Sequence, residues 1–214
     1  MTRQSWRVLG PAAALCLTLV VPAASATPAA PRGGAAPVTA PDTVQTFPGN
    51  LAALRPLRND TDAEGDRLRI CARGPEHYPG IRVDVFEDQK DFYLTARRGT
   101  APGTYTFTYF ACDGTSATPG TVTLTVQKLP RITVRKIAGH PGRLRVTNGA
   151  PFRIRLVYGD YSQDDAEGDV RIPKKSSRVV STRYSKISWF AFVMTPRGSG
   201  DEVGRGHVQG IRQP

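Results

Sequence analysis

Cysteine and histidine are scarce in this 214-residue chain, which has three of each. No CxxC pair and no cysteine–histidine cluster occurs, so the spacings of common zinc and redox sites are missing. The glycine-rich loops that cradle phosphates are also absent, as are the HExxH and GxSxG motifs of metalloproteases and serine hydrolases. These absences argue against an enzyme, and we expect a noncatalytic protein.

A long apolar run is missing as well. The most apolar stretch, residues 8–21, follows Arg3 and Arg7 and precedes the small residues of 24–26. A transmembrane helix needs about 20 apolar residues, so this layout is typical of a secretory signal peptide over residues 1–26. We expect no membrane span, a flexible Pro/Ala/Gly lead over 27–41, and a bacterial protein that is secreted or associated with the cell wall.

Two cysteines remain once the signal peptide is removed, because Cys16 lies inside it. An even pair in an oxidising compartment is the usual signature of a disulfide. The sequence therefore predicts a disulfide between Cys71 and Cys112.

Helical spacing of apolar residues is absent, whereas alternation of apolar and polar residues recurs along the chain. The chain has 21 glycines and 18 prolines, which suits a β protein rich in turns. The strongest alternating segments are 68–71, 81–85, 92–95, 104–112, 121–126, 131–135, 143–146, 152–158, 178–181 and 187–194. Short strands at this spacing predict an all-β fold of two small, immunoglobulin-like β-sandwich domains in tandem, residues 42–128 and 129–214.

The first of these segments carries a recognisable pattern. Asn59-Asp60-Thr61-Asp62-Ala63-Glu64-Gly65-Asp66-Arg67-Leu68 resembles the N-D-x-D-x-x-G-D-x-L opening of bacterial immunoglobulin-like and cadherin-like repeat domains, and 103–114 is similar to their G-x-x-x-F-x-Y-x-x-x-D-G strand. The resemblance covers about 42–128 and implies an extracellular β-sandwich of the adhesin or spacer kind. It leaves 129–214 unassigned.

The acidic stretch within this motif has two interpretations. Asp60, Asp62 and Asp66 offer hard oxygen ligands at close spacing, which could hold calcium, although the twelfth position of an EF-hand loop would fall on Cys71. The same residues suit a polar turn between strands. The pentapeptide DAEGD recurs at 165–169, where we also expect an acidic turn.

Charge is distributed unevenly between the two predicted domains. Residues 42–128 carry 10 basic and 11 acidic side chains, whereas 129–214 carry 16 and 7. Six arginines of the second domain alternate with apolar residues: Arg131, Arg135, Arg143, Arg145, Arg153 and Arg155. If the strands over 131–158 are neighbours, all six lie on one solvent-facing surface.

Such a surface suits an anionic partner, because arginine binds phosphate and carboxylate groups bidentately. One hypothesis is a noncatalytic surface-binding or adhesion module for an anionic cell-surface polymer. The alternative is a structural extracellular protein whose exposed strand faces are basic only for solubility and which binds another protein. Base-specific nucleic-acid recognition has no support beyond charge, since aromatic residues are not interleaved with the basic ones.

Overall fold

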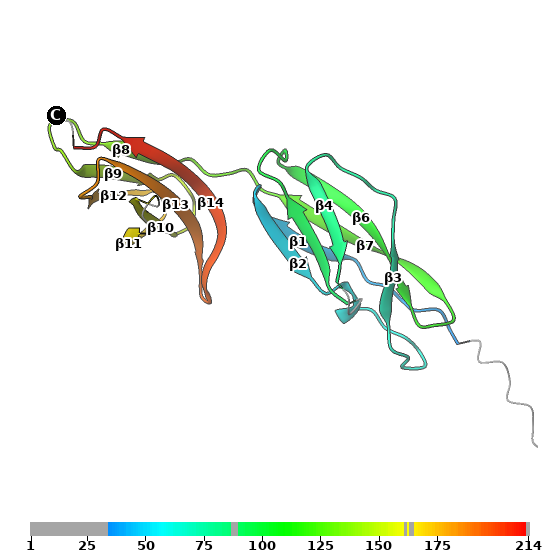
Figure 1. Ribbon diagram of the computed structural model, residues 1–214. Helices are drawn as coiled ribbons and strands as arrows, with labels where there is room; N and C mark the ends of the chain where they lie inside the picture. Colours follow the sequence, from blue (N-terminus) through cyan, green and yellow to red (C-terminus); the bar gives the residue numbers. More distant parts are fainter. Residues whose placement is uncertain (1–33, 87–89, 161, 163–164, 213–214) are drawn as a thin grey trace, which may run out of the picture. The chain divides into compact units, whose positions relative to one another are not determined.

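The computed structural model describes residues 34–86, 90–160, 162 and 165–212; the proposed signal peptide and most of the lead lie outside this range. The first half of the chain forms two sheets (Figure 1). One has the order β1-β7-β6-β3, made of Asp42–Thr46, Ala117–Val126, Gly103–Cys112 and Arg69–Arg73. The other has the order β2-β5-β4, made of Asn50–Leu54, Phe92–Ala96 and Ile81–Val85.

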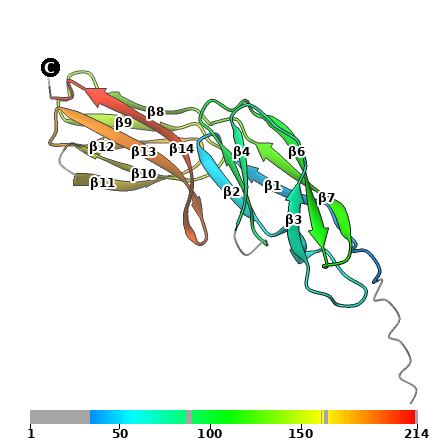
Figure 2. The same ribbon diagram turned by 45° about the vertical axis from the view of Figure 1, so that its right-hand side comes forward.

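Two further sheets are built entirely from the second half (Figure 2). A three-stranded sheet has the order β12-β9-β8, made of Ser176–Ser181, Arg143–Asn148 and Ile132–Lys136. A four-stranded sheet has the order β11-β10-β13-β14, made of Asp165–Ile172, Ile154–Asp160, Lys186–Thr195 and Gly198–Gln209. A 3-10 turn, η1, lies at Pro56–Arg58.

These sheets confirm the predicted all-β class, and each strongly alternating segment overlaps a strand. The second acidic pentapeptide was wrongly predicted to be a turn: Asp165–Ile172 is strand β11. Its pairing with β10 supplies the hydrogen bonds that a turn would have left to water, and places Asp169 beside Arg155. The strands β1, β2 and β14 were missed, since β1 contains a single apolar residue, the sequence of β2 does not alternate, and β14 contains four glycines.

A buried tyrosine belongs to the core of the sandwich formed by β1–β7. Tyr109 of β6 is fully buried, and its hydroxyl donates a hydrogen bond of 2.7 Å to Asp60 Oδ2. Its ring lies over Gly120, its register partner on β7. Phe92, Leu94, Val122 and Leu124 complete the same core. Asp60 thus ties the loop after η1 to the centre of the sheet.

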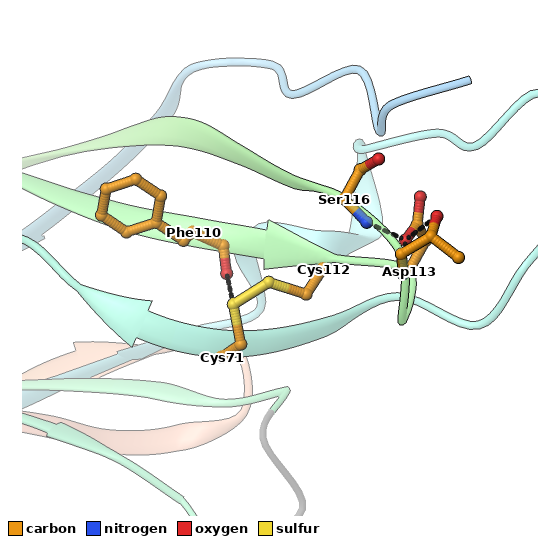
Figure 3. Close-up of a disulfide and its surroundings, with 6 residues drawn as sticks. Cys71, Phe110, Cys112, Asp113 and Ser116 are labelled. Carbon is orange, nitrogen blue, oxygen red and sulfur yellow. Dashed lines mark hydrogen bonds between the residues drawn. A yellow bond between two sulfur atoms is a disulfide. The ribbon is translucent and has the colours of Figure 1, made fainter. Parts of the chain in front are cut away.

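The predicted disulfide between Cys71 and Cys112 is present (Figure 3). Cys71 lies at a β-bulge, where the pairing of β3 with β6 shifts register between Ile70 and Ala72. The Cα atoms of the two cysteines are 5.9 Å apart, a normal distance for a disulfide. The bond therefore fastens the edge strand β3 to its neighbour within one sheet, unlike the disulfide of antibody domains, which joins two sheets.

Removing this disulfide is expected to destabilise the protein. The bond closes a loop of 41 residues, and in the chain-entropy view it stabilises the fold by restricting the unfolded chain. We expect the Cys71→Ala/Cys112→Ala variant to lose about 2–4 kcal/mol of unfolding free energy, measured by urea denaturation. The wild type with a reducing agent is the matched control and should behave alike. Unchanged midpoints in both samples would show that β3 is held without the bond.

A methyl group at Gly120 should be costly for a different reason. A Cβ there would lie 2.2 Å from the Tyr109 ring, which the Asp60 hydrogen bond prevents from moving aside. We expect Gly120→Ala to cost about 2–4 kcal/mol in chemical denaturation. The control is Gly99→Ala, where no heavy atom lies within 4 Å, and it should change stability by less than about 0.5 kcal/mol. Equal effects of the two substitutions would contradict this packing.

Candidate functional site

The central strand of the three-stranded sheet separates apolar from basic side chains. In β9, Leu144, Val146 and Asn148 are fully buried, and the residues that alternate with them point to the other side. Arg143 and Arg145 are therefore exposed, and Thr147 is half-buried. The positions of these arginines follow from the burial of their neighbours.

Strand β8 adds further cations to the same side. Arg135 is the direct register partner of Arg145, and Thr133 is the partner of Thr147. Arg131, just before β8, is held by a 2.9 Å hydrogen bond from Gly149 N to its carbonyl oxygen. On the other flank, β12 contributes Ser177, Val179 and Ser181. We call this surface the basic face; its members are Arg131, Thr133, Arg135, Arg143, Arg145, Thr147, Ser177, Val179 and Ser181.

Acidic side chains are missing from this surface. The strands β8, β9 and β12 contain no aspartate or glutamate. Among the residues that the structure describes, Arg131, Arg135, Arg143 and Arg145 have no carboxylate within ion-pair distance. Like charges that face each other across a strand pair destabilise a sheet by a few tenths of a kcal/mol to about 1 kcal/mol. The Arg135–Arg145 pair is such a contact, and it would be relieved by an anion bound between the two guanidinium groups.

The surface is hollowed rather than flat. A depression of about 580 Å³ is lined by Arg131, Thr133, Arg135, Arg145 and Thr147, together with Lys136 and the turn that follows β8. Lys136 Nζ itself donates to the Gly210 carbonyl oxygen, at 3.1 Å. All charged side chains in the lining of this depression are cationic.

Arg153 and Arg155 do not join the other four arginines. The expectation that the strands over 131–158 are neighbours is wrong, because β10 lies in the four-stranded sheet and β9 pairs with β12 instead. Arg155 forms a salt bridge of 2.6 Å with Asp169, and this hydrogen-bonded contact raises the pKa of Arg155. Arg153 precedes β10, where its carbonyl oxygen accepts a hydrogen bond from Met194 N. The structure thus brings together four of the six predicted residues.

Sequence reasoning missed the hydroxyl groups of this surface. Thr147 Oγ1 and Ser177 Oγ are 3.0 Å apart on adjacent strands. The alternation of Ser177, Val179 and Ser181 was visible in the sequence. Nothing in the sequence order, however, indicated that β12 would lie beside β9.

Asp60, Asp62 and Asp66, the candidates for calcium ligands or a polar turn, lie in the loop between η1 and β3. Asp60 accepts hydrogen bonds from Ala40 N and the Tyr109 hydroxyl. Asp62 Oδ1 accepts from the backbone N–H groups of Glu64 and Asp66, which closes a polar turn, and the Asp66 side chain is exposed. Within the described ranges, no group of three or more histidine, cysteine, aspartate or glutamate residues could hold a metal ion. The turn interpretation therefore fits the geometry of this segment.

Asp42, at the start of β1, lies close to Asp60 and is electrostatically strained. Burial of its carboxyl group, followed by repulsion from Asp60, raises the pKa of Asp42 to about 6, against a weaker opposing hydrogen bond from Asn59. One carboxylate oxygen of Asp42 is buried without a hydrogen-bond partner. The same environment affects Tyr109, whose pKa is raised by burial and by its hydrogen bond to Asp60.

This arrangement predicts a pH-dependent effect of Asp42→Asn. A carboxyl group whose pKa is raised on folding stabilises the protein at low pH and loses that contribution as pH rises through about 6. We expect Asp42→Asn to be more stable than the wild type at pH 7.5 by about 1 kcal/mol, a value reduced because the side chain is only half-buried. The advantage should vanish near pH 4, as measured by thermal denaturation.

The control for this prediction is Asp66→Asn, which neutralises an exposed carboxylate in the loop between η1 and β3. Its effect on stability should be small at both pH values. A gain from Asp42→Asn that does not depend on pH would contradict the assigned repulsion.

One hydroxyl–imidazole contact was not foreseen. Ser188 Oγ and His207 Nδ1 are 2.9 Å apart on β13 and β14, at an exposed position. In the described part of the chain, no carboxylate is bonded to His207, so the pair lacks the third group that orients a catalytic histidine. The contact is explained by cross-strand pairing alone.

Comparison with known proteins identifies the first half of the chain. Residues 35–127 match the family model described as "Bacterial Ig domain", which confirms the predicted resemblance for this segment. This segment is therefore a bacterial immunoglobulin-like domain, and the match covers less than half of the 214 residues. None of the curated proteins matches the chain. In the described residues, no helix is long and apolar enough to cross a membrane.

Solved structures resemble the chain only distantly. A SusE-like, surface-located polysaccharide-binding protein from the heparin utilisation locus of Bacteroides thetaiotaomicron is 10% identical, with a TM-score of 0.39. The match covers 80% of this chain but 33% of that protein, so the chain spans a third of its length. A chimeric titin Z1Z2 structure is 18% identical with a TM-score of 0.30, covering 81% of this chain and 94% of titin Z1Z2. Likeness at this level supports no inference about ligand or partner.

Proposed function

We propose that this protein is a noncatalytic, exported binding module that attaches to an anionic polymer of a cell surface through the basic face. The observation that carries the proposal is the gathering of Arg131, Arg135, Arg143 and Arg145 on one side of a sheet whose strands contain no acidic residue. Arginine pairs with phosphate, sulfate or carboxylate groups through bidentate hydrogen bonds.

The four-stranded sheet of the same domain gives an internal comparison. Two arginines of this sheet have carboxylate partners: Arg155 pairs with Asp169, and Arg205 pairs with Glu202. Solubility alone would be served equally well by such pairs on the three-stranded sheet. The uncompensated charge of the basic face therefore favours an external anion over solvation alone.

The two halves of the chain would then have different tasks. The immunoglobulin-like domain is nearly neutral, with 10 basic and 11 acidic side chains over 42–128, and would act as a spacer or support. The basic domain over 129–214 would make the attachment. A boundary near Leu129 is supported by the sheets, none of which combines strands from both sides of it. Export depends on the signal peptide proposed for residues 1–26.

Binding of the full chain to immobilised heparin and to purified cell walls tests this function. We expect retention that weakens steeply as NaCl rises from about 50 mM to about 500 mM, because screening acts strongly on exposed charges. Arg135→Glu/Arg145→Glu should lower the affinity by about tenfold or more. Arg69→Glu/Arg73→Glu, on the exposed edge strand β3, makes the same change in net charge and should leave most of the binding intact.

A single substitution separates loss of binding from loss of folding. Arg145→Glu places a carboxylate opposite Arg135, so the sheet should gain stability while the basic face loses affinity. Equal binding by the wild type and Arg135→Glu/Arg145→Glu would contradict the proposed function and return the search to protein partners.

A further inference from the structure

The cations of the basic face are spaced regularly along the strands. Residues that share one face of a strand recur every second position, about 6.6 Å apart. The register of β8, β9 and β12 sorts the basic face into successive rows along this direction. In order, the rows hold Arg131; then Thr133, Thr147 and Ser177; then Arg135, Arg145 and Val179; then Arg143 and Ser181.

This spacing has a chemical counterpart. Two residues of a strand contain six backbone bonds, and an extended chain advances about 1.2 Å per bond. A phosphodiester polymer with a three-carbon link between phosphates also has six bonds in each repeat, from one phosphorus atom to the next. Its extended repeat is therefore about 7 Å. One phosphate of such a chain would meet each row of the basic face.

We propose that the basic face binds a linear phosphodiester polymer without nucleobases, laid parallel to β8 and β9. This proposal rests on the proposed function and specifies the polymer class. Phosphates would be clamped at the row of Arg135 and Arg145 and contacted at the rows of Arg131 and Arg143. The intervening row, with Thr133 and Thr147, offers hydroxyl groups as hydrogen-bond donors.

The composition of the basic face argues for a polymer without bases. Proteins that bind single-stranded nucleic acids combine basic grooves with aromatic side chains on which the bases stack. The nine residues of the basic face include no aromatic one. A polymer that needs only charge and hydroxyl contacts fits this surface better than one with bases to bury.

The distribution of cations along and across the strands determines the direction proposed for the polymer. Strand β12 contributes only Ser177, Val179 and Ser181 to the surface. A polymer that crossed the strands would therefore meet cations on β8 and β9 but none on β12. Along the strands, cations extend from Arg131 to Arg143 over three row spacings, about 20 Å. The depression is lined by Arg131, Thr133 and Arg135, which follow one another just before and along β8, and by Arg145 of β9.

The experiment uses labelled oligomers of 1,3-propanediol phosphate, from one to about eight phosphates, and fluorescence anisotropy with the full chain at low salt. We expect the affinity to rise by several-fold per added phosphate up to about four, and then only in proportion to the number of binding registers. Arg131→Ala removes the end row and should move this break to about three phosphates. Affinity that rises evenly with length, with no break, would overturn the row arrangement.

A gain of affinity tests the row that lacks a cation. Thr133→Arg should tighten binding of the four-phosphate oligomer by several-fold, with little effect on a single phosphate. The control is Thr121→Arg, which adds the same charge at an exposed position of β7 and should not help. Equal gains from both substitutions would show that only net charge matters.

Two other polymers separate this inference from the proposed function. Oligothymidylate with the same number of phosphates should bind no more tightly than the base-free oligomer, and polygalacturonate should bind more weakly. Tighter oligothymidylate binding, or equal binding of polygalacturonate, would overturn the assigned polymer while leaving polyanion binding intact. Failure of all of these polymers and of heparin to bind would instead contradict the proposed function itself.

Discussion

Strand pairing with alternating burial is the constraint on which the rest of this structure depends. In β9, Leu144 and Val146 lose all contact with water, and this fixes Arg143 and Arg145 on the opposite side. A shift of one residue would bury both guanidinium groups and expose both apolar side chains, at a cost far above the stability of a small domain. The basic face is thus held in place by the core beneath it.

The pairing of arginines with acidic side chains differs from one sheet to the next. In the immunoglobulin-like domain, Arg55 meets Asp91 and Arg82 meets Asp84, at 2.7 and 2.8 Å. In the four-stranded sheet, Arg155 is neutralised by Asp169, and the contact lowers the pKa of that aspartate. Exposed salt bridges add little stability, but they remove the excess charge of a surface. On the basic face this compensation is missing, and the field of its arginines extends into solvent.

The sequence allowed the fold class to be predicted because alternation is a local property that needs no tertiary information. Strand order is not local, and this is why Arg153 and Arg155 were misplaced. After β9 the chain crosses to the other sheet, and the second partner of β9 arrives only with β12. The prediction for 165–169 was wrong for a related reason. Its acidic composition suggested a turn, whereas pairing with β10 makes it a strand. The bond between Asp60 and Tyr109 joins residues 49 positions apart, beyond what a motif can indicate.

The opposed arginines also connect folding with recognition. Arg135 and Arg145 face each other in the folded sheet and separate when the chain unfolds, so their repulsion acts against the native state alone. An anion between them removes this repulsion and binds only where the two guanidinium groups are held together. Binding must therefore stabilise the fold by the same free energy that the fold contributes to binding. The repulsion between Arg135 and Arg145 thus lowers the unfolding free energy of the free protein, and an anion bound between them would restore it.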